Sequence, residues 1–194
     1  MIGKANLIDA ISGTNRGLLA SEPQKQAILA AIANLEDFNP TPRPVEASNL
    51  LDGDWRLIYT TSKALLNLDR IPFCKLGQIY QSIRVNTNSV YNIAEIYGLP
   101  YLEGLVSVAA KFEPISERRV QVKFHRSILG LKRLIGYSSP ASFIQQIEAG
   151  KKFPAIDAAI NSEKQQGWLD ITYIDSDLRI GKGNEGSVFV LSKT

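Results

Sequence analysis

The sequence has one cysteine, Cys74, and one histidine, His125, among 194 residues. One cysteine cannot form an intramolecular disulfide, which fits a reducing compartment. The usual zinc ligand sets cannot be assembled from one residue of each type, and a Cys–His catalytic pair would require these two residues to meet in the fold. We therefore expect no metal site and no catalytic residues. Whether Cys74 is inert or redox-responsive is left open.

Long apolar runs and a strong excess of one charge are also missing. No apolar run approaches the ~20 residues that a membrane span needs. The first 17 residues resemble neither a secretory signal nor an organelle leader, so we expect a bacterial chain or one already processed. Lys and Arg total 22 against 19 Asp and Glu, a net charge of +3. So small an excess of positive charge is not typical of a nucleic-acid-binding protein, but it still permits docking on anionic lipid.

The first 47 residues have the pattern of a helical lead-in. Apolar residues at helical spacing precede a breaker at 13–15, and Ser21 with Pro23 is typical of a helix start. The apolar stripe of this second helix is Ile28, Ala31, Ile32 and Leu35. Three prolines in residues 40–44 cannot continue a helix. We predict a lead-in over 1–47, a stiff linker and a β domain over 48–194, within one structural domain overall.

After residue 52 the pattern is that of short β-strands joined by turns. Strands are expected at 55–61, 79–85, 90–97, 105–112, 120–126, 168–174, 178–180 and 187–191. Most connections are too short for crossover helices, which favours an antiparallel meander. The prediction is a mainly β protein with an antiparallel barrel of about eight strands and N-terminal helices. The interior of such a barrel is just wide enough for side chains or one small ligand.

Residues 127–166 form a long insertion between two expected strands. Helices are expected near 142–148 and 155–162. Long connections in compact domains are often lids or binding loops, so we expect this one to cover the open end of the barrel.

Three segments resemble known families. Gly53-Asp54-Trp55, a Gly-x-Trp before a strand, resembles the first motif of lipocalins. The segment 167–191, GWLDITYIDSDLRIGKGNEGSVFVL, resembles the C-terminal signature of the PAP/fibrillin family, the plastid lipid-associated proteins. Residues 54–61, DWRLIYTT, are similar to the strand that follows the helical N-terminus in that family. The resemblance covers nearly the whole chain.

This resemblance implies a lipocalin-like (calycin) barrel associated with thylakoids or lipid globules such as plastoglobules. It implies a bound lipid, carotenoid or prenylquinone and no other cofactor. The family occurs in plastids and cyanobacteria. We expect a cyanobacterial, photosynthetic origin, with peripheral attachment to the cytoplasmic side of the thylakoid membrane or to a lipid globule. A processed plant form would lie in the plastid.

Large side chains on the strands are candidate ligand contacts, although core packing is the commoner role of such residues. The candidate ligand-binding residues are Trp55, Tyr59, Phe112, Phe124, Tyr173, Arg179 and Phe189. Leu178 and Arg179 face opposite ways, so one of them must point inward. An inward Arg179 could stack on Trp55 and close the base, or bind the polar head of a ligand.

Strand alternation places Leu169, Ile171 and Tyr173 on one face and Asp170 on the other. A buried Asp170 needs a partner, and an arginine is the simplest one. His125, opposite Phe124, is expected at the surface. The glycine-rich segment 181–186 lacks the context of a phosphate-binding loop and is expected to be a hairpin.

A basic and apolar stretch follows the fifth expected strand. We expect a peripheral membrane contact formed by Arg126, Leu129, Leu131, Lys132 and Arg133. The alternative is a solvated strand edge followed by a loop over the core.

The sequence as a whole favours non-catalytic binding or carriage of an apolar lipid, prenylquinone or carotenoid. Two alternatives stay open. One is a structural coat protein of lipid surfaces with a filled barrel. The other is an enzyme acting on a lipid or pigment, which would need a polar dyad such as Asp170 with Tyr173 or Arg179. The ligand, the cavity and the oligomeric state are not determined by the sequence.

Overall fold

The computed structural model describes residues 2–70, 72–161, 163, 166–184 and 186–194. Within these residues, nine strands form one antiparallel sheet in the order β4-β3-β2-β1-β9-β8-β7-β5-β6. The strands are β1 (Gly53–Thr60), β2 (Lys75–Arg84), β3 (Ser89–Tyr97), β4 (Gly104–Pro114), β5 (Arg119–Leu131), β6 (Ile156–Ala159), β7 (Gln166–Ile174), β8 (Leu178–Gly183) and β9 (Val188–Lys193).

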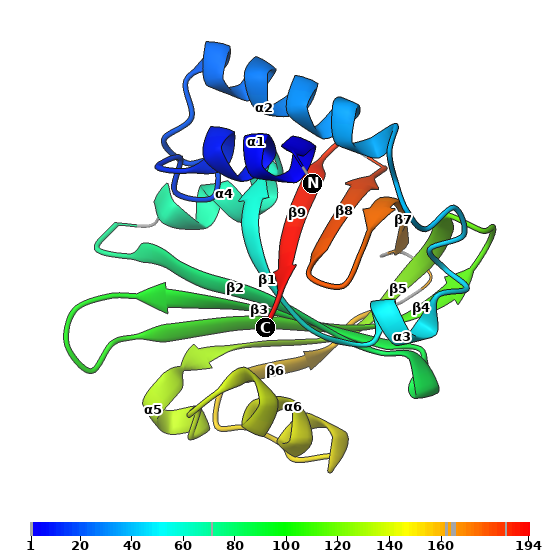
Figure 1. Ribbon diagram of the computed structural model, residues 1–194. Coiled ribbons are helices and arrows are strands. Elements are labelled where there is room, and N and C mark those ends of the chain that lie inside the picture. Colours follow the sequence, from blue (N-terminus) through cyan, green and yellow to red (C-terminus); the bar gives the residue numbers. More distant parts are fainter. Residues whose placement is uncertain (1, 71, 162, 164–165, 185) are drawn as a thin grey trace.

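The sheet closes on itself because β4 also pairs with β5. Eight of the described strands thus form a barrel-like ring, and β6 extends it by pairing with β5. This confirms the prediction of a mainly β, antiparallel fold of about eight strands. Figure 1 shows the ring between two layers of helices.

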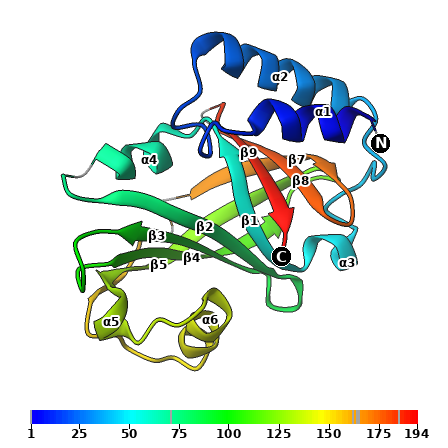
Figure 2. The same cartoon turned by 60° about the vertical axis from the view of Figure 1, so that its left-hand side comes forward.

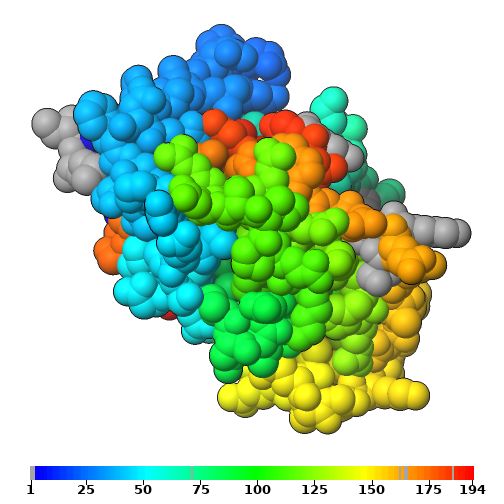
Figure 3. Space-filling view, turned by 90° about the vertical axis from the view of Figure 1, so that its right-hand side faces the viewer, coloured from blue at the N-terminus to red at the C-terminus, as the bar shows by residue number. Residues whose placement is uncertain are grey.

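One end of the ring is sealed by α3 (Ser48–Leu51). Leu51 packs into the interior cluster, and the Trp55 indole Nε1 donates a hydrogen bond of 3.0 Å to its carbonyl oxygen. The preceding linker lies against the same end, where the Val45 amide donates to the Glu117 carbonyl at 3.1 Å. Figure 3 shows this segment, in light blue, running beside the green β4–β5 connection. α2 has already ended at Glu36, and the proline-containing segment that follows leads the chain to α3 at this end of the ring.

The N-terminal helices α1 (Ile2–Ile11) and α2 (Glu22–Glu36) cover the outer face of β1, β9, β8 and β7. Ser21 caps α2 through a complete capping box with Gln24, which confirms the predicted start. The apolar faces of both helices form one buried cluster with side chains of these strands. Its main members are Leu7, Ile11, Ile28, Ile32, Leu35, Tyr59, Tyr173, Leu178, Ile180, Val188 and Val190.

The insertion forms α5 (Lys132–Ile135), α6 (Pro140–Glu148) and β6. Phe143, Ile144 and Ile147 of α6 join a buried cluster with side chains of β3, β4 and β5. These strand residues alternate with those of the interior, so α6 covers the outer face of the sheet opposite α1 and α2 (Figure 2). The prediction of a helix at 142–148 is confirmed. The expectation that the insertion forms a lid over the open end is wrong for α6.

Two further expectations about the insertion need correction. Residues 127–131 continue β5, because β4 pairs with β5 as far as Leu131. The segment expected as a helix at 155–162 contains β6 instead, while residue 162 lies outside the described residues. β7 pairs with β5 only through Lys123, and the edge of β5 beyond that point binds residues 156–159 as a strand.

Three short helices complete the fold: α4 (Lys63–Leu66), η1 (Asn67–Arg70) and η2 (Val85–Thr87). The first two follow β1 at the end of the ring opposite α3. No helix in the described part of the chain has both the length and the apolar character to cross a membrane.

Candidate functional site

The sealed base of the ring holds Trp55 and Arg179. Trp55 is fully buried and Arg179 is 1% exposed. The guanidinium carbon of Arg179 lies 4.9 Å from the centre of the Trp55 ring, so the charge stacks on the indole face. Leu178 faces the outer helices instead, which confirms that one of these two residues points inward. The stack corresponds to the base-closing role expected for Arg179.

Arg179 has a polar neighbourhood inside the ring. It donates a hydrogen bond to the side-chain oxygen of Gln81, whose amide nitrogen donates to Asn92 at 2.7 Å. Its Nε has no hydrogen-bond partner among the described residues. Burial lowers the pKa of Arg179 to about 9. The base of the ring therefore contains a buried guanidinium group that uses only part of its hydrogen-bonding capacity among the described residues.

Phe112, Phe124 and Phe189 belong to the interior cluster together with Trp55. Phe112 is buried, whereas Phe124 and Phe189 are only partly buried. The interior is therefore packed tightly near the base and less tightly toward other parts of the ring. All three side chains thus face the interior of the ring.

Tyr59 and Tyr173 do not face the interior. Both lie in the cluster beneath α1 and α2. A β-bulge between Leu57 and Tyr59, and another between Ile171 and Tyr173, each insert one extra residue. An extra residue reverses the alternation of the residues that follow it. The prediction that Ile171 and Tyr173 share a face is therefore wrong.

A groove of about 920 Å³, which we call the mouth groove, lies beside the end of β1 and the start of β2, at the end of the ring opposite the base. Its walls come from the α1–α2 loop, the end of β1, α4 with η1, and the start of β2. Leu18 and Leu76 line the groove and also pack against the interior cluster. The groove thus borders apolar side chains that also belong to the interior cluster.

The lining of the mouth groove is amphipathic. Leu18, Leu19, Leu66 and Leu76 contribute apolar surface, and Tyr59 also lines the groove. The charged groups of the lining are Lys25, Lys63, Asp69, Arg70 and Lys75. Four cations against one carboxylate suit a molecule with an apolar body and an electron-rich or anionic head.

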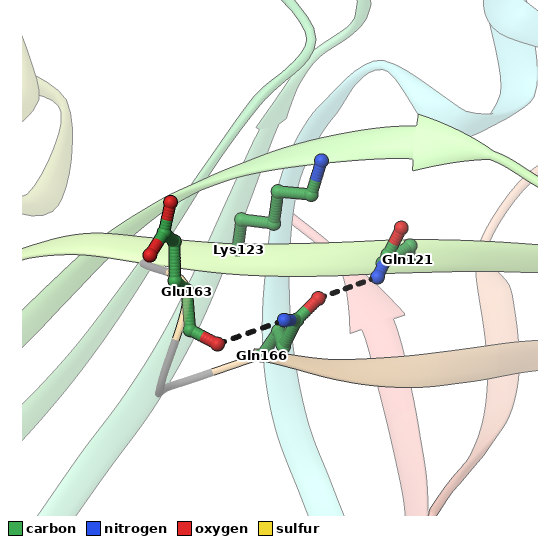
Figure 4. A pocket seen from close by; sticks show the side chains of 4 residues that line it. All are labelled: Gln121, Lys123, Glu163 and Gln166. Atoms are coloured by element: carbon green, nitrogen blue, oxygen red, sulfur yellow. Dashed lines mark hydrogen bonds between the residues drawn. The ribbon is translucent and has the colours of Figure 1, made fainter. Parts of the chain in front are cut away.

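A smaller pocket of about 300 Å³ is lined by Gln121, Lys123, Glu163 and Gln166 (Figure 4). Gln121 donates to the side chain of Gln166 at 2.6 Å, and Gln166 donates to the Glu163 carbonyl at 2.9 Å. All four lining side chains are polar. This pocket therefore suits water better than an apolar ligand.

The five residues expected at a membrane contact do not form one surface. Arg126 binds both carboxylate oxygens of Asp157, at 2.8 and 2.7 Å. Leu129, which is 47% exposed, pairs with Val106 and so lies on the inner face of the sheet with Leu131.

Lys132 and Arg133 lie beside an exposed aromatic loop instead. The Lys132 amine lies 5.0 Å from the ring centre of Tyr97, and the guanidinium carbon of Arg133 lies 5.7 Å from that of Tyr101. The membrane contact expected from the sequence did not include these tyrosines. The sequence does contain a feature that indicates this loop: the turn Gly98-Leu99-Pro100-Tyr101-Leu102 is unusually apolar for a connection between strands.

Several smaller expectations have clear outcomes. Asp170 pairs with Arg119 through hydrogen bonds of 2.6 and 2.7 Å, as predicted. Tyr173 donates to Asp175 at 2.7 Å. His125 is exposed, and the β8–β9 connection is a hairpin with a positive φ at Gly186. The oxygens of Asp170 are thus engaged by Arg119.

Comparisons with known proteins agree on one family. The family model PAP_fibrillin matches residues 1–192. The chain is 34% identical to "Light-induced protein, chloroplastic" of Solanum demissum, with 98% of this chain and 66% of the relative covered. It is 33% identical to "Probable plastid-lipid-associated protein 2, chloroplastic" of Arabidopsis thaliana, covering 98% and 70%.

A third relative is "Chromoplast-specific carotenoid-associated protein, chromoplastic" of Cucumis sativus, 33% identical, with 98% of this chain and 67% of the relative covered. The chain spans about two thirds of the length of these curated relatives. No solved structure matches it significantly.

Proposed function

The chain belongs to the PAP/fibrillin family, and from this membership we propose that it binds or carries an apolar lipid, prenylquinone or carotenoid without catalysis. The names of its relatives record association with plastid lipids and with carotenoids. We propose that this chain works at the surface of a thylakoid membrane or lipid globule. In a cyanobacterium that is the cytoplasmic side of the thylakoid, and in a plant it is the plastid.

The mouth groove is the observation that carries the proposal. Its volume of about 920 Å³ falls within the usual range for small-molecule sites. A ligand body resting on Leu18, Leu66 and Leu76 would adjoin the apolar interior. At ~25 cal/mol per Å², a few hundred Å² of buried ligand surface stabilises the complex by several kcal/mol before ordering costs.

The polar side chains that an enzyme would use, Asp170, Tyr173 and Arg179, already interact with other residues of the protein. Arg119 holds Asp170, Tyr173 donates to Asp175, and Arg179 stacks on Trp55. This arrangement supports binding over catalysis, because a general acid or base must be within reach of a substrate.

A titration with a short-chain prenylquinone, followed by quenching of tryptophan fluorescence, tests the proposal. Leu66→Asp places a charge in the groove, and we expect it to weaken binding about ten-fold or more. Ala64→Asp is the matched control, because Ala64 is an exposed residue of the same helix that does not line the groove. Equal affinities of both variants and the parent protein would contradict the groove as the site.

A coat protein with a filled ring is the second candidate. The observation that favours it is the tight packing around Trp55, Arg179 and Phe112. Native mass spectrometry with organic extraction separates the two candidates. A stoichiometric quinone, carotenoid or lipid supports carriage. A ligand-free protein that binds vesicles in a strongly salt-dependent way supports the coat protein.

A further inference from the structure

Six large apolar side chains are exposed at one rim of the molecule, and we call them the rim patch. They come from the η1–β2 connection, the end of β3 with the β3–β4 connection, and α5. The members, with their exposed fractions, are Phe73 (84%), Tyr97 (46%), Leu99 (56%), Tyr101 (77%), Leu102 (53%) and Leu134 (59%). In Figure 1 these three segments follow one another down the left side, with the β3–β4 connection between the other two.

The contacts between the three segments show that the patch is continuous. A Cβ added at Gly98 would lie 3.8 Å from the Phe73 carbonyl oxygen, which places the first two segments side by side. The Lys132 amide donates to the Glu103 carbonyl at 2.9 Å, which ties α5 to the β3–β4 connection. The side chain of Arg133 faces the Tyr101 ring.

The two most exposed members also have an unfavourable backbone. Phe73 has φ 61° and Tyr101 has φ 69°, the left-handed region that favours Gly, Asn and Asp. A bulky aromatic residue in this region is a conformational cost, and its exposure to water adds a second cost. Both aromatics occupy connections where a small polar residue would suit the isolated protein better. This combination is expected where the side chains contact something else.

The charges around the rim patch identify the contact. Its flanking cations are Arg70, Lys75, Lys132 and Arg133, against the carboxylates of Asp69, Glu95 and Glu103. Lys75 lies 3.5 Å from Asp69 and Lys132 lies 3.2 Å from Glu95. Arg70 and Arg133 are exposed and form no ion pair within the described residues. Two guanidinium groups that form no ion pair with the described residues, beside exposed aromatic and leucine side chains, suit an anionic lipid surface.

We propose that the rim patch inserts into an anionic lipid surface and orients the mouth groove toward it. The proposal rests on the proposed function, because it names the surface through which the lipid association is made. Arg70 and Lys75, which flank the patch, also line the mouth groove. Docking therefore brings the groove to the lipid surface, and an apolar molecule can pass between them with little exposure to water.

Flotation with lipid vesicles tests the proposal on the full chain. The variant Phe73→Asn/Tyr101→Asn removes both aromatics and supplies a residue that tolerates the left-handed backbone. We expect its binding to vesicles of phosphatidylcholine with phosphatidylglycerol to weaken about ten-fold or more. Its melting temperature should stay the same or rise, which separates loss of docking from loss of fold.

Phe38→Asn is the matched control. Phe38 is 74% exposed and follows α2, whose C-terminal end lies at the right in Figure 1, away from the rim patch. We expect this variant to bind vesicles like the parent protein. Arg133→Gln should reduce binding only when the vesicles contain the anionic lipid.

Several outcomes would overturn the proposal. Unchanged flotation of the double variant would do so, as would an equal loss in Phe38→Asn. Failure of the parent protein to bind either vesicle would also overturn it and would leave a protein partner as the occupant. Quinone affinity measured without vesicles should not change in the double variant, so failure of docking and failure of ligand binding are distinguishable.

Discussion

Asp175 connects the N-terminal helix to the barrel through a single side chain. It accepts hydrogen bonds from the Lys4 amine at 2.9 Å, the Tyr173 hydroxyl at 2.7 Å and the Leu178 amide at 2.7 Å. Burial alone raises the pKa of Asp175, but these hydrogen bonds together lower it below the ordinary value of 3.8. The ionised carboxylate is therefore the form that holds α1 against the β7–β8 turn.

Asp175→Asn should lower the free energy of unfolding at pH 7 by about 1–3 kcal/mol, since it weakens hydrogen bonds to a charged group. Because folding lowers the pKa of the Asp175 carboxyl, the ionised carboxylate stabilises the folded protein at pH values above the pKa of this group in the unfolded chain. That contribution is lost as pH falls from about 4 toward the folded pKa. The difference between the two proteins should therefore shrink in acid, as urea unfolding at pH 7 and near pH 3 will show.

Asp177→Asn is the control for this prediction. The Asp177 side chain is 64% exposed and also accepts from Lys4, so its loss should cost less. A difference between Asp175→Asn and the parent protein that grows in acid would contradict the assignment.

The α1–α2 loop is the element that shapes one wall of the mouth groove. The Thr60 amide donates to the Arg16 carbonyl at 3.1 Å, and the Arg16 side chain donates to the Leu76 carbonyl at 2.7 Å. Gly17 follows with φ 102°, and a Cβ there would lie 2.4 Å from the Thr60 carbonyl oxygen. The loop reaches β1 only because this residue is glycine.

Gly17→Ala should therefore displace the loop and weaken both stability and quinone binding. Gly13→Ala is the matched control, because Gly13 also has a positive φ but a Cβ there would meet nothing within 4 Å. The control should lose only the roughly 1–2 kcal/mol of the left-handed backbone. Thermal melts and quinone titrations of the two variants will measure the difference, and equal losses would argue against the close approach to β1.

The whole molecule consists of a ring of strands between two helical layers, each layer sharing a buried cluster with the ring. α1 and α2 contribute five of the buried residues that pack on β1, β7, β8 and β9: Leu7, Ile11, Ile28, Ile32 and Leu35. If either the helical layer or the ring unfolds, the apolar surface buried between them becomes exposed to water. The helices are thus part of the core.

We expect the helices and the ring to unfold in one transition. Trp168→Phe leaves Trp55 as the sole tryptophan, which reports on the base of the ring. Its fluorescence and the far-UV circular dichroism of the helices should change at the same urea concentration. Loss of the helical signal at lower urea would show that α1 and α2 form a separable unit.

Features set by neighbouring residues could be read from the sequence. Ser21 and Pro23 begin a helix, no helix continues through the prolines at 40–44, and turn residues separate the strands, because these effects act within a few residues. The alternation of Leu178 and Arg179 likewise predicted that one side chain must enter the ring. Local rules were therefore sufficient for most strands and for the inward position of one of these two side chains.

Other features depend on contacts between distant segments. The bulges that turn Tyr59 and Tyr173 outward arise where β1 and β7 pair with β9 and β8, and the free edge of β5 makes a strand of residues 156–159. The rim patch and the mouth groove each combine segments far apart in the sequence. The sequence by itself determined most of the elements and their order, through local backbone preferences, but not β6. Only the tertiary structure decided which side chains share a surface, because closing the ring sets every register at once.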